Sequence, residues 1–67
     1  MKTVQEMVSY LTSNNYWIDK SLSGYYRLLR GPVNNQVDSE LLIDDSACED
    51  YYDYDSAVYS FYEYVIG

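Results

Sequence analysis

The 67-residue chain has no histidine, one cysteine, one proline and three glycines. The absence of histidine removes the usual base at neutral pH and, with a single cysteine, disfavours a structural zinc site. Cys48 stands alone, which excludes a disulfide within the chain and fits a reducing compartment. The chain also has no Gly-rich phosphate loop. We therefore expect a protein that is not an enzyme and needs no metal or cofactor.

Long apolar runs are also missing. No stretch approaches the roughly 18 apolar residues of a transmembrane helix, and a mixed polar segment follows Lys2 where a signal peptide would be apolar. We therefore expect a cytoplasmic protein. Hydrophobic residues still make up 48% of the chain, which is enough for a core, so residues 1–67 are expected to form one small domain.

Positive charge is absent from the second half of the chain. All four basic residues lie before residue 31, whereas nine of the eleven acidic residues follow residue 33, and the net charge is −7. This distribution disfavours direct binding to nucleic acid or to an anionic membrane. It favours a basic protein as partner.

The first half of the chain predicts a helix followed by strands. Thr3 and Glu6 have the spacing of a capping box, and apolar residues then recur at helical spacing over residues 4–13. Asn14 and Asn15 tolerate the left-handed conformation that ends a helix. Aromatic and β-branched residues predict three strands, the third antiparallel to the second and preceded by a polar loop. The strands are expected from residue 16, over residues 25–30 and over residues 39–44, with the loop at 33–38.

One segment has two interpretations. Residues 21–30 also fit a short helix that would end at Gly31, but Gly24 and the paired tyrosines favour a turn and a strand.

The last third predicts helix. Ser46 and Glu49 form a second capping-box pattern, and an apolar stripe begins at Ala57, so this region is one long helix or two short ones broken near Tyr54. The fold class is therefore α+β, with a helix, a small three-stranded antiparallel sheet and a helical C-terminus. The expected core consists of Val4, Val8, Leu11, Trp17, Ile18, Leu28, Leu41, Ile43, Ala57, Val58, Phe61 and Val65.

Residues 44–67 combine seven carboxylates with six tyrosines. Asp45, Glu49 and Asp53 follow one another at intervals of four, which on a helix places them about 5–6 Å apart. Like charges at that distance repel by about 0.7 kcal/mol each in bulk water. If a small domain tolerates several such repulsive pairs, the negative electrostatic field that they create is useful to the protein. Two or three of the six tyrosines are expected in the core and the others at the surface.

This spacing approximates that of successive phosphates along a nucleic-acid strand, so a rigid acidic face could occupy a groove lined by Lys and Arg. Tyrosine adds stiff contact area and can take a guanidinium over its ring. We therefore expect a basic, nucleic-acid-binding partner. The expected partner-binding residues are Asp44, Asp45, Glu49, Asp50, Tyr52, Asp53, Tyr54, Asp55 and Glu63.

In size, charge and acidic-aromatic texture the chain resembles the small phage-encoded anti-CRISPR proteins and other DNA-mimic inhibitors. The residues that carry the resemblance lie at 44–45, 49–55 and 62–64. These inhibitors share no common fold, so the resemblance implies a target rather than an architecture: a CRISPR effector subunit that holds DNA or reads its PAM. The alternative function is a protein-interaction or assembly module, including a homodimer, that uses exposed tyrosines. A small hydrolase is the least favoured interpretation.

Overall fold

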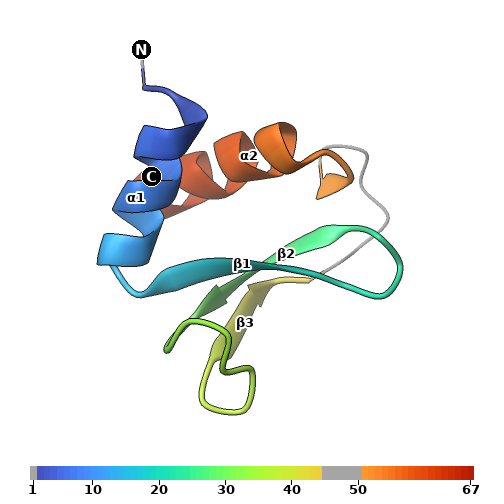
Figure 1. Ribbon diagram of the computed structural model, residues 1–67. Coiled ribbons are helices and arrows are strands. Elements are labelled where there is room, and N and C mark those ends of the chain that lie inside the picture. The colour runs from blue at the N-terminus through green and yellow to red at the C-terminus, as the bar shows by residue number, and fades with distance from the viewer. Residues whose placement is uncertain (1, 45–50) are drawn as a thin grey trace.

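The chain folds in the order helix, three strands, helix (Figure 1). The computed structural model describes residues 2–44 and 51–67. The elements are α1 (Val4–Ser13), β1 (Tyr16–Lys20), β2 (Tyr26–Arg30), β3 (Glu40–Ile43) and α2 (Tyr54–Ile66). This confirms the predicted α+β class. The second predicted capping box, at Ser46 and Glu49, lies outside the described residues.

Helix α1 begins and ends where its sequence predicts. The Glu6 backbone N–H donates to Thr3 Oγ1 at 3.2 Å, and the Thr3 backbone N–H donates to Glu6 Oε1 at 3.1 Å. These reciprocal bonds form the capping box. The bond from the Thr3 backbone N–H, with that from its side chain, holds the pKa of Glu6 below its usual value. The chain leaves the helix through Asn15, whose φ is 68°.

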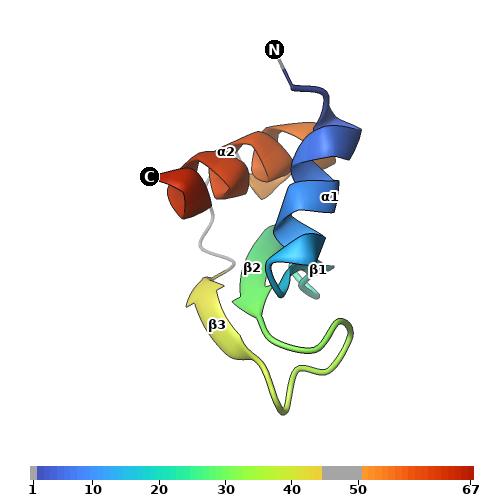
Figure 2. The same cartoon turned by 90° about the vertical axis from the view of Figure 1, so that its left-hand side faces the viewer.

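The three strands form an antiparallel sheet in the order β1-β2-β3, which confirms the strand interpretation of the segment before Gly31. Ile18 pairs with Leu28 in the β1–β2 register. Both helices cover one face of the sheet, and the 31–39 connection runs on the other side (Figures 1 and 2). The core between helices and sheet centres on Leu11, Leu28 and Phe61.

The prediction that Leu41 belongs to the core is wrong, because β3 carries an extra residue. Leu29 pairs with Leu41 and Leu28 with Ile43, so β3 advances two residues where β2 advances one. Leu42 is therefore the bulged residue. The bulge breaks the alternation, so Leu42 and Ile43 both pack against the core while Leu41 is 44% exposed.

The face of the sheet away from the helices has a small core of its own. Trp17 and Leu29 form a cross-strand pair on that face, and both are buried. The predicted polar loop folds back over them. Trp17 Nε1 donates to Ser39 Oγ at 3.0 Å, and Ser39 Oγ donates to the Asn35 carbonyl at 2.6 Å. The burial of Leu29 was not predicted from the sequence.

Helix α2 starts at Tyr54, so the alternative of one long C-terminal helix is wrong. Asp53 has φ −98° and ψ 134°, which is extended backbone, and it caps the helix. Ala57, Val58 and Phe61 are buried, as predicted. Besides Leu29, one more buried residue was not predicted from the sequence.

That residue is Met7, which is 5% exposed, whereas Val4 and Val8 are only half-buried. Met7 is buried because it lies on the side of α1 against which α2 packs. Val4 lies in the first turn, and Val8 faces a cavity beside β1.

Candidate functional site

The exposed side of α2 lies opposite its core residues. Asp55, Tyr59 and Glu63 follow at intervals of four residues, and all three are exposed. At a rise of 1.5 Å per residue, about 12 Å of helix axis separates Asp55 from Glu63. Two carboxylates with a tyrosine between them therefore form a stripe that is inclined to the helix axis.

The stripe continues past the start of the helix through Asp53. Its Oδ2 accepts the Ser56 backbone N–H at 3.2 Å, and the Ser56 hydroxyl donates to the same oxygen at 3.3 Å. This fixes the carboxylate at the helix N-terminus, where the helix dipole favours negative charge. Asp53 is still exposed, so a partner can approach it.

Aromatic pairs attach the start of α2 to the β1–β2 hairpin. Tyr25 and Tyr52 meet edge to face with ring centroids 5.4 Å apart, and Tyr26 and Tyr54 do the same at 5.4 Å. Tyr51 packs on Phe61 at 5.1 Å. Such pairs are worth about 0.5–1.5 kcal/mol each beyond their buried area. The segment that carries the carboxylates is therefore held in place by rings.

None of the described tyrosines after residue 50 is fully buried. Tyr51 and Tyr62 are half-buried, while Tyr52, Tyr54, Tyr59 and Tyr64 are exposed. Tyr52 and Tyr54 pack one side of each ring on the hairpin and are still 65% and 41% exposed. The expectation of two or three core tyrosines therefore overstates their burial.

The predicted partner-binding residues divide into three groups. Tyr52, Asp53, Tyr54 and Asp55 come together at the N-terminus of α2, and Glu63 lies on the same helix. With Tyr59, these residues make up what we call the acidic–aromatic face. Asp44 is exposed and follows β3, apart from that face in the chain. Asp45, Glu49 and Asp50 lie outside the described residues.

The predicted helical series Asp45, Glu49 and Asp53 is wrong at its last member. Asp53 is the cap and has extended backbone, so it does not continue a helix from residues before it. The series that the structure does show is Asp55, Tyr59 and Glu63. The sequence contained this signal, because the three residues are spaced by four and lie opposite the buried stripe.

Most of the positive charge lies on the β1–β2 hairpin. Arg27 is bound to Asp19 at 2.7 Å, and Gln36 donates to the same carboxylate oxygen at 2.7 Å. Lys20 lies over the Tyr26 ring at 5.7 Å, and Arg30 over the Tyr16 ring at 5.9 Å. The remaining cation is close to the acidic–aromatic face.

Lys2 and Glu63 line the same hollow between α1 and α2, together with Met7, Tyr59, Tyr62 and Ile66. The positive charge of Lys2 therefore offsets part of the field at the C-terminal end of the face. Sequence reasoning could not find this neighbour, because the two residues meet only through packing of the two helices. At the other end, Asp53 and Asp55 place two exposed carboxylates two positions apart in the chain.

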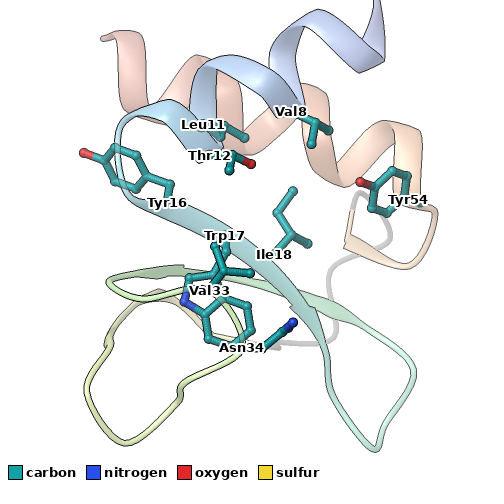
Figure 3. Close-up of a pocket in the computed structure, with 9 residues that line it drawn as sticks. All are labelled: Val8, Leu11, Thr12, Tyr16, Trp17, Ile18, Val33, Asn34 and Tyr54. Atoms are coloured by element: carbon teal, nitrogen blue, oxygen red, sulfur yellow. The ribbon is translucent and has the colours of Figure 1, made fainter.

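A second concave feature lies beside β1. It is a cavity of about 160 Å³ between α1, β1, the 31–39 loop and the start of α2 (Figure 3). Its lining consists of Val8, Leu11, Thr12, Tyr16, Trp17, Ile18, Val33, Asn34 and Tyr54. Tyr54 thus belongs both to this cavity and to the acidic–aromatic face.

The described residues do not assemble a group of three or more His, Cys, Asp or Glu side chains that could hold a metal ion. Neither α1 nor α2, the helices of the described segments, is long and apolar enough to span a membrane. Comparisons of the chain with protein-family models, curated proteins and solved structures found no match. Any function must therefore be argued from the surface itself.

Proposed function

We propose that the acidic–aromatic face binds a Lys/Arg-rich, nucleic-acid-binding site of another protein and blocks it without a chemical reaction. The observation that carries the proposal is the separation of charge. Every basic residue precedes residue 31, while nine of eleven acidic residues follow residue 33. The described face contains only carboxylates and tyrosines. Lys2 shares a hollow with Glu63 at one end, and Lys20 lies over the Tyr26 ring that packs on Tyr54.

The geometry of the face suits a groove that otherwise holds a nucleic-acid strand. Asp55 and Glu63 project from one side of a regular helix about 12 Å apart, roughly two steps of the 5–6 Å helix-face spacing. Asp53 extends the row beyond the helix. Because the helix and the tyrosine pairs fix these groups before binding, little entropy is lost when a partner orders them.

The tyrosines supply contact area between the charges. Tyr52 is 65% exposed and Tyr59 is 49% exposed, so each ring can receive an arginine guanidinium while its hydroxyl bonds to polar groups. A groove that binds phosphates is rich in arginine and lysine. Carboxylates and tyrosine rings together therefore match both the charge and the shape of such side chains.

The kind of target follows from the resemblance to anti-CRISPR proteins. We infer that the partner is a subunit of a CRISPR effector complex and that the face imitates DNA at the site that reads the PAM or holds the duplex. Effectors of this type contact PAM bases with arginine and hold nucleic acid in positively charged channels. A protein of this function would act in the cytoplasm of the host cell.

A second candidate is self-association through apolar surface on α2. Tyr59, Tyr64 and Ile66 are between 49% and 57% exposed. A homodimer through these residues would appear in sedimentation as a species of twice the monomer mass, and Tyr64→Ala would abolish it. A net charge of −7 on each copy opposes this association and makes it the weaker proposal.

The experiment measures inhibition of DNA binding by purified CRISPR effectors of several types. We expect the wild type to compete with the target duplex for one of them. The double variant Asp55→Asn/Glu63→Gln should compete about tenfold less well or worse, since each lost carboxylate leaves a partner cation unpaired. Glu40→Gln removes one exposed charge on β3 and is the control for each single variant, Asp55→Asn and Glu63→Gln; it should retain inhibition.

Two results would overturn the proposal. One is that no effector loses DNA binding in the presence of the wild-type protein. The other is that Glu40→Gln weakens inhibition as much as each single variant, because the effect would then depend on net charge and not on the face.

A further inference from the structure

Within residues 2–44 and 51–67, strand β1 lies at an edge of the sheet and pairs on one side only. Along an antiparallel pair, residues alternate between bonding to the neighbouring strand and pointing away from it. The Ser21 N–H donates to the Tyr25 carbonyl, and the Gly31 N–H donates to the Asn15 carbonyl. Odd-numbered residues of β1 therefore bond to β2.

The even-numbered residues Tyr16, Ile18 and Lys20 thus direct their backbone N–H and C=O groups away from β2. An edge of this kind is a template for another strand. The opposite edge is less suitable, since the bulge at Leu42 interrupts β3. β1 keeps a regular register over all five of its residues.

The cavity of about 160 Å³ lies beside this edge (Figure 3). Its walls come from both sides of the sheet: Tyr16 and Ile18 from the helix-covered face, Trp17 and Val33 from the loop-covered face. A space bounded from both faces lies in the plane of the sheet. In that plane the backbone of a fourth strand would run beside β1, and its side chains would point to one face or the other. A side chain on the helix-covered face would enter the part of the cavity between Ile18 and α1.

The size and lining of the cavity define which side chain of a partner it can hold. An apolar protein cavity of about 150 Å³ holds a benzene molecule, so this one has room for a single phenylalanine or leucine side chain. Val8, Leu11 and Ile18 supply an aliphatic wall, and the Tyr54 hydroxyl lies on the side toward Ile18 (Figure 3). A charged side chain would have no ion pair there.

We propose that β1 receives an extended segment of the basic partner as a fourth strand, with one apolar side chain of that segment in the cavity. The proposal deepens the inhibitor function above and rests on it. Tyr54 joins the cavity to the acidic–aromatic face, and Asp53 and Asp55 flank Tyr54 in the chain. Lys20 belongs to the same edge and lies over the Tyr26 ring at 5.7 Å. The two carboxylates outnumber this cation, so charge complementarity selects a segment with lysine or arginine close to its apolar anchor.

The test uses the whole protein, labelled with ¹⁵N and ¹³C, and the peptide Lys-Thr-Val-Phe-Val-Thr-Lys as probe. We expect the backbone amides of Tyr16, Ile18 and Lys20 and the methyl groups of Val8 and Val33 to shift on titration. Replacing the central phenylalanine of the peptide by alanine keeps its charge and should weaken binding about tenfold, since most of one apolar anchor is lost.

Two surface variants complete the design. Thr12→Phe places a ring at the cavity wall and should weaken peptide binding about tenfold, the value of one apolar anchor. Ser9→Phe adds the same ring to an exposed position of α1 that does not line the cavity, and it should leave peptide binding unchanged. Both positions are exposed, so both variants are expected to fold.

Three results decide between the sites. Shifts confined to the acidic–aromatic face, with equal affinity for both peptides, would refute the strand site and leave the inhibitor function intact. Shifts at β1 that depend on protein concentration without peptide would assign the edge to a second copy and also refute the proposal. Peptide binding at β1 without inhibition of any effector would uphold the site and remove the inhibitor function.

Discussion

Asp53 is both the cap of α2 and a carboxylate of the acidic–aromatic face. Its Oδ2 accepts the Ser56 N–H at 3.2 Å. Replacement by asparagine keeps an acceptor for that N–H and removes only the charge, because asparagine and aspartate cap helices about equally well. Replacement by alanine removes both. The pair of variants therefore separates the part of Asp53 in folding from its part in binding.

The expected effect on stability follows from the contact. An alanine at an N-cap costs about 1 kcal/mol of folding free energy, with a range of about 0.5–2 kcal/mol. For a domain of this size about 1 kcal/mol lowers the Tm by roughly 4–8 °C. We expect that decrease for Asp53→Ala and less than half of it for Asp53→Asn. Thermal unfolding followed by circular dichroism measures both.

The expected effect on binding is different. At a temperature where all three proteins are folded, Asp53→Asn and Asp53→Ala should weaken inhibition of the effector to the same extent, because both lack the charge. If Asp53→Asn inhibits as well as the wild type, Asp53 is not part of the binding face. If Asp53→Asn lowers the Tm as much as Asp53→Ala, the contact with Ser56 does not stabilise the helix.

Three further predictions concern the fold. Gly31→Ala should unfold the protein at room temperature, since φ is +146° and a Cβ would lie 2.6 Å from Ser39 Oγ and 2.9 Å from Ser39 Cα. Gly24→Ala, with φ +95° and only an ordinary 3.5 Å contact, should lower the free energy of unfolding in urea by about 1–2 kcal/mol. Equal costs for the two variants would contradict the close approach of Ser39 to Gly31. Ser39→Ala should cost about 1–3 kcal/mol, in part by leaving the Trp17 indole N–H without its acceptor. The cost should be smaller in a Trp17→Phe background, where only the bond from Ser39 Oγ to the Asn35 carbonyl is lost. The pKa of Glu6 is lowered in the folded state from 4.5. Its contribution to stability is therefore present above that pH and is lost as the pH falls through the folded-state pKa. Glu6→Gln should flatten the acid side of a plot of unfolding free energy against pH.

The elements that were predicted correctly carry local signals. Thr3 and Glu6 form a capping box within one turn, and Asn15 takes the left-handed conformation that ends α1. These features depend on neighbours three or four residues away, which the sequence displays. The apolar stripe that begins at Ala57 likewise predicts the buried side of α2 without knowledge of what it packs against.

The features that were missed depend on contacts between distant segments. The bulge at Leu42 depends on how β3 pairs with β2, so the simple alternation wrongly placed Leu41 in the core. The burial of Leu29 on the far face was not predicted, because it requires a loop that closes over the Trp17–Leu29 pair through Ser39. No local pattern marks either feature.

The candidate site likewise combines features that the sequence displays with features that depend on contacts between distant segments. The acidic and aromatic composition of residues 51–63 is visible in the sequence, but the rings that hold Tyr52 and Tyr54 come from the hairpin. The position of Lys2 beside Glu63 and the cavity at the β1 edge also arise only when the helices and the sheet assemble.

The most direct test of the acidic–aromatic face measures inhibition of one CRISPR effector's DNA binding as salt rises from about 50 mM to about 500 mM. Charges at an exposed interface are screened over this range, so the affinity of the wild type should fall about tenfold or more. Asp55→Asn/Glu63→Gln should show a weaker dependence on salt. An affinity that does not change over the whole range would contradict the claim that the carboxylates of this face bind the partner.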